Sequence, residues 1–160
     1  MTKPNVEANS VDLADFDTGA ASDAGTEIEL QHPTTKKGLG VFFSVLGKDS
    51  QVFRDHVKER ANARIRREAL ASRRGKPLDP PTADEADANA VELLTLCTTS
   101  WRSETKNDKG EVVSQEPTIT LRGEKLAFNV ANVQRVYTEQ LWIRRQIDEA
   151  IGDMENFIKS

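Results

Sequence analysis

The chain has 160 residues and a net charge of -4, and 37% of its residues are hydrophobic while 30% are charged. This length allows one domain with a single core, and the high charged fraction implies that part of the chain stays outside that core. The acidic balance gives no overall field that would attract nucleic acid or an anionic membrane, and the one cysteine, Cys97, excludes an internal disulfide and a cysteine-based zinc site.

Residues 1–25 predict a disordered acidic arm. They contain aspartates among Ala, Ser, Gly and Asn, with few larger apolar side chains. The chain also starts without a basic segment followed by an apolar run, and no apolar stretch is long enough to span a bilayer. We therefore expect a cytoplasmic protein without membrane contact, in which residues 26–160 form one domain.

A β-hairpin is expected next. Residues 27–30 alternate polar and apolar side chains as a half-buried strand does, residues 32–38 are rich in turn formers, and residues 40–47 are again β-prone. A hairpin alone is marginal in water, so we expect its apolar face to lie on the helix that follows.

A long basic helix is expected to begin at Asp49 or Ser50, which are good N-cap residues, and to end near Arg74. Apolar residues recur at every fourth position, which predicts one buried face: Phe53, Val57, Ala61, Ile65 and Ala69. The opposite face carries an excess of cations: Lys58, Arg60, Arg64, Arg66, Arg67, Arg73 and Arg74.

The rest of the chain predicts further helices and a second hairpin. Thr82–Glu85 has the spacing of a capping box, and the apolar side of the helix that it starts extends to Trp101. Residues 101–128 predict a hairpin, and two helices follow, from Asn129 and from about residue 141 to residue 158. The predicted fold class is α+β: a predominantly helical domain with one or two β-hairpins and a disordered acidic N-terminal arm.

No catalytic constellation is visible in the sequence. His56 is expected to be a structural histidine on the apolar side of its helix, and Cys97 a small buried hydrophobe with no histidine nearby. The turn at residues 107–111 lacks the alternating oxygen ligands of a calcium loop. Trp101 and Trp142 are expected to pack in the core. We therefore expect no enzyme activity, no cofactor and no metal site.

The basic helix at residues 58–74 allows two interpretations. Seven cations along one helix could follow the phosphates of a nucleic acid, which makes nucleic-acid binding an alternative function. However, no aromatic side chains interleave with these cations for base stacking, and the whole chain is acidic. A solvated face, or a docking face for an acidic partner, is therefore favoured.

Five segments carry a resemblance to a known family. They are Glu-Ile-Glu-Leu-x-His-Pro at 27–33, Val-Leu-Gly-Lys-Asp-Ser at 45–50, the Arg-rich helix at 62–74, Cys-Thr-x-x-Trp at 97–101, and the C-terminal segment at 141–157. In this order they resemble the tail assembly chaperones of long-tailed, siphovirus-type bacteriophages, over residues 26–158. The acidic arm and the charged segment 104–122 depart from the family pattern, so nothing carries over to them.

The resemblance implies a chaperone that binds the phage tape measure protein, keeps it soluble in the host cytoplasm and helps to recruit the major tail tube protein. Such a chaperone is absent from the mature virion, and coverage of a long partner by many copies implies weak homo-oligomerisation. A structural tail or tail-completion protein is an alternative. Tube subunits are chiefly β, and the helical periodicity of this chain argues against that alternative.

The partner-binding residues that we expect are cations of the basic helix and of the C-terminal helix, together with an aromatic residue near the end of the chain. They are Arg64, Arg67, Arg74, Arg144, Arg145 and Phe157. For Phe157 a wholly structural role remains an alternative.

Overall fold

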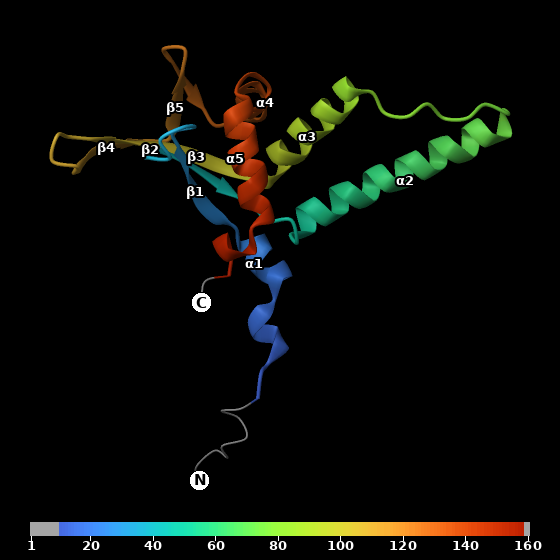
Figure 1. Cartoon of the computed structure of the whole chain (residues 1–160), viewed down its shortest axis with the longest axis horizontal. Helices are drawn as coiled ribbons and strands as arrows, with labels where there is room; N and C mark the ends of the chain where they lie inside the picture. Colours follow the sequence, from blue (N-terminus) through green and yellow to red (C-terminus); the bar gives the residue numbers. More distant parts are fainter. Residues whose placement is uncertain (1–9, 159–160) are drawn as a thin grey trace, which may run out of the picture.

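The computed structural model describes residues 10–158 and has a body of strands and helices from which one long helix projects (Figure 1). After a short 3-10 helix at Leu13–Phe16, the elements follow in this order: α1 (Thr18–Ala24), β1 (Thr26–Gln31), β2 (Gly38–Val45), α2 (Gln51–Arg73), α3 (Ala83–Cys97), β3 (Thr98–Lys106), β4 (Val112–Glu116), β5 (Thr118–Leu121), β6 (Glu124–Ala127), α4 (Val130–Glu139) and α5 (Leu141–Gly152). A second 3-10 helix spans Met154–Asn156. The α+β class with dominant helices is confirmed.

The prediction of a disordered arm is wrong for residues 18–24, which form α1. The helix is held by contacts with the start of α2. Ser22 is fully buried and its carbonyl accepts a hydrogen bond from Gly47 N–H at 3.1 Å, while the Asp23 carboxylate accepts one from Gln51 N–H at 2.7 Å. A side chain at position 47 would collide with Ser22, so this close approach requires glycine. Residues 1–9 lie outside the described residues.

The predicted first hairpin is confirmed as β1 and β2, and it forms part of an antiparallel sheet of order β1-β2-β3-β4. In this register Phe43 lies between Ile28 and Trp101. The expectation that the hairpin packs on the following helix is wrong. Its apolar face covers α4 and α5 instead, with the Phe43 and Tyr137 rings 6.1 Å apart.

The segment after α3 also differs from the prediction. The helix ends at Cys97, and Trp101 lies on β3. Two β-prone residues, Thr98 and Thr99, begin the strand, and Trp101 pairs with Phe43 of β2. The expected single hairpin in residues 101–128 is two hairpins: β3–β4 extends the main sheet, and β5–β6 forms a second sheet. Arg122 and Gly123, both with positive φ, form its turn.

The two C-terminal helices are confirmed, with one change of boundary. Asn129 caps α4 by accepting a hydrogen bond from Asn132 N–H at 2.9 Å, as the sequence predicts. Helix α5 ends at Gly152 instead of near residue 158, because Asp153 leaves the helix and its carboxylate accepts from Glu155 N–H in the following 3-10 turn.

The body of the molecule encloses one hydrophobic core, with Trp101 buried and Trp142 packed against its edge. Its buried residues come from the sheet, the β5–β6 hairpin and helices α3 to α5: Leu30, Phe43, Val45, Val91, Leu94, Trp101, Ile119, Leu126, Val133, Val136, Tyr137, Ile143, Ile147 and Ile151. Helix α2 contributes little beyond Phe53, which is partly buried.

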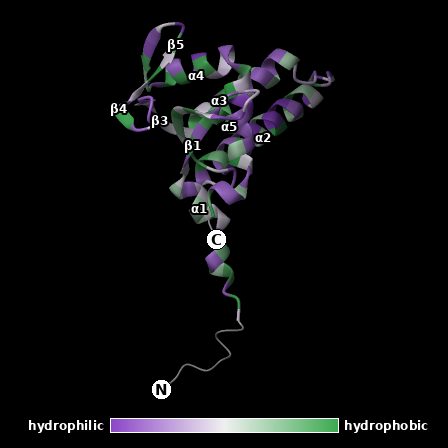
Figure 2. Cartoon of the chain, turned by 60° about the vertical axis from the view of Figure 1, so that its left-hand side comes forward, coloured by the Kyte–Doolittle hydropathy of each residue, from purple (hydrophilic) through white to green (hydrophobic). Residues whose placement is uncertain are grey.

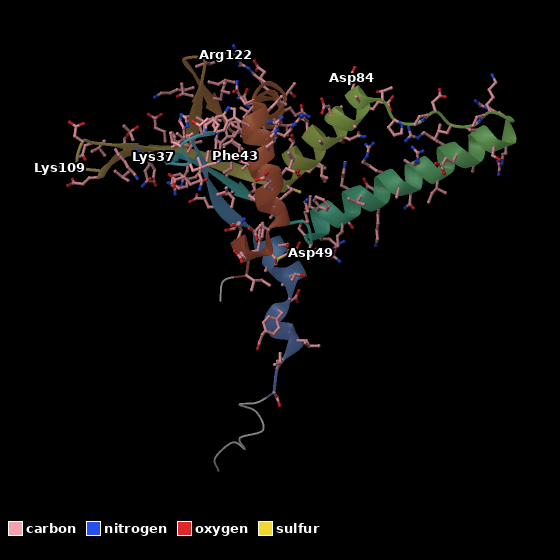
Figure 3. All side chains as sticks on the ribbon, viewed as in Figure 1. Lys37, Phe43, Asp49, Asp84, Lys109 and Arg122 are labelled. Carbon is pink, nitrogen blue, oxygen red and sulfur yellow. The ribbon has the colours of Figure 1, made fainter. Side chains whose placement is uncertain are left out.

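The predicted buried face of α2 is wrong. His56 is its one buried residue, while Val57 is 47% and Ile65 61% exposed. Much of α2 has the purple colour of hydrophilic residues (Figure 2), and its side chains project into open space beyond the body (Figure 3). None of the helices in residues 10–158 combines the length and the apolar character needed to cross a membrane.

Candidate functional site

Helix α2 is attached to the body through its first two turns. The Ser50 hydroxyl caps the helix by accepting a hydrogen bond from Phe53 N–H at 3.2 Å, and Ser50 itself is fully buried. Phe53 packs on the core and His56 is buried one turn later. Residues 57–73 are not covered in this way. Most of them are exposed, and the three that are not are only half-buried: Ala63, Arg64 and Ala71. The helix therefore leaves the body as a projecting element.

Helix α3 is attached by its other end. Val91, Leu94 and Cys97 are buried, whereas nearly all residues of its first two turns are exposed. Thr82 caps the exposed end by accepting from Glu85 N–H at 3.1 Å, as the sequence predicts. Helices α2 and α3 therefore diverge from a common base, and residues 74–82 join their far ends (Figure 1).

A cleft of about 760 Å³ lies between the two helices. On α2 it is lined by three arginines and one glutamate, together with His56 and two alanines: His56, Glu59, Arg60, Ala61, Ala63, Arg64 and Arg67. On α3 it is lined by Glu85, Ala88, Asn89 and Glu92, and Pro81 lies just before that helix. One wall is therefore basic and the other acidic, with small alanine side chains between the charges. Near the base of the cleft, Arg60 and Glu92 approach to 3.9 Å.

The charge difference extends over the whole of both helices. Helix α2 holds seven cations and three carboxylates, a net charge of +4, and α3 holds four carboxylates and no cation, a net charge of -4. Away from the cleft, Val57 and Ile65 lie two turns apart on α2 and are exposed. We call these two residues the exposed stripe of α2. The sequence predicted the helix and its cations but not that this stripe faces solvent.

His56 is a buried polar residue at this cleft, and one of its ring nitrogens lacks a hydrogen-bond partner. It is 9% exposed, lines the cleft, and its Nε2 atom makes no hydrogen bond within the described residues. His56 was predicted on the apolar side of its helix, and it is buried although Val57 and Ile65 of that side are exposed. Around His56, the lining of the cleft combines cations, carboxylates and alanine side chains.

The remaining candidates for chemistry have structural positions. Burial raises the pKa of the Cys97 thiol to about 11, which keeps it protonated at neutral pH. The His32 Nδ1 atom accepts from the Thr34 and Thr35 amides in the β1–β2 turn. In the part of the chain that the structure describes, no group of three or more His, Cys, Asp or Glu residues could hold a metal ion.

The six predicted partner-binding residues occupy two regions. Arg64 and Arg67 line the cleft, and Arg64 is also paired with Glu68 at 2.9 Å. Arg74 ends α2, donating its backbone N–H to carbonyls of the last turn. These three therefore lie on the projecting helix and its end.

The other three lie on the body. Arg144 on α5 is largely covered and reaches Asp87 of α3 at 3.3 Å, and its neighbour Arg145 is exposed. Phe157 is half-buried and packs against the core. The structure thus brings Arg64 and Arg67 together at the cleft but does not join them to the C-terminal group.

A second polar cluster on the outer face of the sheet was missed by the sequence analysis. Arg102 lies 4.0 Å above the ring of Phe42 and pairs with Glu27 and Glu104. The Arg102 guanidinium donates a hydrogen bond to the Glu27 carboxylate, and this bond holds the pKa of Glu27 below its usual range. The cluster could have been found only by predicting residues 98–106 as a strand beside β2, because the register places Arg102 opposite Phe42.

Comparison with known proteins gives no relative: no protein family, no curated protein and no solved structure matches this chain.

Proposed function

We propose that this protein is a tail assembly chaperone, which binds the tape measure protein of a phage tail, keeps it soluble and helps to recruit major tail tube subunits. The observation that carries the proposal is the projecting helix α2, whose apolar and basic side chains are presented to solvent by a folded body. An element of this kind is suited to binding a long helical partner with apolar stripes and acidic flanks.

The positions of four of the five resembling segments support this proposal. Segments 45–50, 97–101 and 141–157 meet at the base of α2: Leu46 N–H donates to the Cys97 carbonyl at 2.7 Å, and Lys48 N–H donates to the Ile151 carbonyl at 3.1 Å. Segment 62–74 is the outer part of α2 itself. The resemblance is therefore concentrated on α2 and on the part of the fold that holds it.

The mechanism that we propose is coverage. A tape measure helix exposes long apolar stripes in water, and burial of such surface stabilises a complex by about 25 cal/mol per Å² before the costs of association. The exposed stripe of α2 supplies the apolar contact, and cations such as Lys58 and Arg66 supply charge for acidic residues of the partner. One copy covers a short length, so many copies are needed for each tape measure chain.

Coexpression tests the proposal. We expect the tape measure protein to remain in the supernatant and to copurify with this chain, and to precipitate without it. An Ile65→Asp variant should lose this effect. Val113→Asp is the matched control, because Val113 on β4 is 60% exposed and Ile65 is 61% exposed. A tape measure that is equally insoluble with and without the chain, and that does not copurify, would contradict the chaperone assignment.

A second measurement separates the chaperone from a structural tail protein. A chaperone that leaves before the tail is complete should be absent when purified virions are examined by mass spectrometry. Its presence there at a stoichiometry similar to that of tail subunits would favour the structural alternative.

A further inference from the structure

The short segment before α1 exposes apolar side chains and carries negative charge. We call residues 11–17 the acidic segment. Its larger apolar residues Val11, Leu13 and Phe16 are 69%, 80% and 57% exposed. The segment also holds three aspartates and no cation, which gives a net charge of -3. Helix α2 exposes apolar residues among cations, so the two surfaces are complementary in charge and both leave apolar side chains in water.

The acidic segment already holds two of its apolar side chains together. Leu13–Phe16 is a 3-10 helix, and the Asp12 carboxylate caps it by accepting a hydrogen bond from Ala14 N–H at 2.9 Å. In a 3-10 helix, side chains three positions apart lie above one another. Leu13 and Phe16 therefore point to one side, and a surface that binds both has little of the segment left to order.

Helix α1 holds the end of the acidic segment at the start of α2. The Asp23 carboxylate of α1 accepts a hydrogen bond from the first residue of α2, and a Cβ atom on Gly19 would lie 3.9 Å from Arg54 Nη2. At about 100° per residue, Arg54 lies between Val57 and Ile65 in angle round the helix. The acidic segment thus begins on the side of α2 that carries the exposed stripe.

The spacing of the apolar residues is the same on the two surfaces. Val57 and Ile65 are eight residues apart, which is about 12 Å along a helix. From Phe16 to Val11 the distance is about 6 Å over the 3-10 turn and about 7 Å over two extended residues, or about 13 Å. Phe16 can therefore lie on Val57 while Val11 lies on Ile65, and Leu13 then lies between them.

We propose that the acidic segment folds back along α2 of its own chain and covers the exposed stripe, with Asp15 beside Lys58. In the structure the segment lies below α1 while α2 runs to the right of it (Figure 1), so the structure holds the open form. One residue, Asp17, separates the 3-10 helix from α1, and its backbone is extended. A change of backbone angles at this residue turns the segment from the open to the closed position.

Closure is weak and depends on the tether. An attached segment has an effective concentration on the order of 1 mM, so a contact with a dissociation constant of about 1 mM between separate molecules is closed about half of the time. A few apolar contacts and one exposed ion pair are of this strength. One consequence rests on the proposed function: the tape measure competes with the segment, and closure lowers its affinity about twofold.

A spin label on the acidic segment of the full chain tests closure. Ala14→Cys places the label on the exposed side of the 3-10 helix, and the fully buried Cys97 stays unlabelled. We expect the label to broaden the amide signal of Ile65 in NMR spectra and to leave the signals of α4, at the other end of the body (Figure 1), unchanged. An Ile65 signal that is unaffected by the label would overturn the proposal.

A matched pair of variants shows whether the apolar contact causes the broadening. Leu13→Asp should remove the broadening at Ile65, whereas Val113→Asp, at a similarly exposed position on β4, should retain it. Because both side chains are exposed, neither variant disturbs the core, and the amide spectrum of the body reports this in the same sample. Broadening that persists in Leu13→Asp would contradict the assigned contact.

A charge exchange identifies the paired residues. Asp15→Lys alone and Lys58→Glu alone should each lower the equilibrium constant of closure roughly threefold to fivefold, because like charges then meet. The two substitutions in one chain should restore it to within about twofold, since an opposite pair forms again. Absence of this recovery would overturn the placement of Asp15 beside Lys58.

A mixing experiment separates closure within one chain from binding to a second copy. A spin-labelled chain is mixed with an isotope-labelled chain that carries no spin label, and only the second chain is observed. We expect no broadening at Ile65, and broadening there would mean that the segment covers another molecule, which contradicts the proposal. Since none of these measurements needs the tape measure protein, closure can fail while the chaperone function stands, and the reverse also holds.

Discussion

Helices α2 and α5 both carry apolar residues at helical spacing, but only α5 buries them. On α5, Ile143, Ile147 and Ile151 are at most 7% exposed, whereas on α2 Val57 and Ile65 are 47% and 61% exposed. These apolar positions of α5 all carry large side chains, which face the sheet. Among the predicted apolar positions of α2, alanines alternate with the larger side chains. Periodicity therefore predicts a helix and its apolar side, but burial also needs an apolar surface within reach.

The largest difference is expected between Phe43→Ala and Ile65→Ala. Phe43 is fully buried, with ring centroids 5.5 Å from Trp101 and 6.1 Å from Tyr137, so truncation should lower the free energy of unfolding by about 3–5 kcal/mol. Ile65→Ala should change it by less than about 0.5 kcal/mol, since the side chain is mostly in water. Urea unfolding measures both values.

The comparison fails if the two variants lose similar stability. A loss above about 2 kcal/mol for Ile65→Ala would mean that α2 packs on the body in solution. Phe42→Ala gives a further control, because Phe42 neighbours Phe43 but lies on the outer face of the sheet, half-buried.

Much of the fold could be predicted from local signals. The cap at Ser50, the cap at Thr82 and the cap at Asn129 place the helices, and the alternation in residues 27–30 places the first strand. The misses arise where long-range contacts decide. Helix α1 is polar and ordered by the α2 start, and Trp101 is on a strand because β2 pairs with it.

The candidate site was predicted in part. Its cations Arg64 and Arg67 were singled out, but the acidic wall that faces them was not, because it depends on how α2 and α3 are placed. The absence of cations in α3 was readable in the sequence and could have indicated a charged partner surface. Phe157 was expected to bind the partner, with a structural role as the alternative, and it packs against the core.

The second prediction concerns the stability of the folded body at alkaline pH, which depends on the buried Cys97 and not on the projecting helix. Burial raises the pKa of Cys97 to about 11 in the folded chain, so the folded state holds the thiol proton more tightly than the unfolded state does. Stability from this group is complete below the unfolded pKa near 9 and is lost as pH rises toward 11. We expect a loss of roughly 1–2 kcal/mol by about pH 10.5.

Thermal melts between about pH 8 and pH 10.5 measure this loss. Cys97→Ala should melt earlier at pH 8 but show a shallower fall, because it lacks the thiol. Burial also raises the pKa of Tyr137, which is retained in both proteins and gives them the same remaining slope. Parallel curves for the two proteins would show that Cys97 does not cause the pH dependence.

A smaller effect is expected from the two helix caps at the cleft. Ser50→Ala leaves the Phe53 N–H without its acceptor at a fully buried position and should cost about 1–2 kcal/mol. Thr82→Ala removes a cap from the exposed end of α3, where water replaces the hydroxyl, and should cost about 0.5 kcal/mol. Denaturant midpoints compare the variants, and equal losses would contradict the view that only the base of α2 is joined to the body.

The smallest expected effect is that of Glu27→Gln on the outer face of the sheet. Glu27 and Arg102 are partly exposed, so the variant should lose less than about 1 kcal/mol at neutral pH and low salt. The Arg102 hydrogen bond lowers the pKa of Glu27 in the folded chain, so its contribution is present above the usual carboxyl pKa and disappears as pH falls through the lowered value. The melting temperatures of the variant and the unmodified chain should therefore differ at about pH 7, and by less at a pH below the usual carboxyl value of 4.5. The exposed Glu149 provides the control, since Glu149→Gln should follow the unmodified chain at both pH values. If the difference for Glu27→Gln persists at low pH, the effect comes from the shape of the side chain and not from its charge.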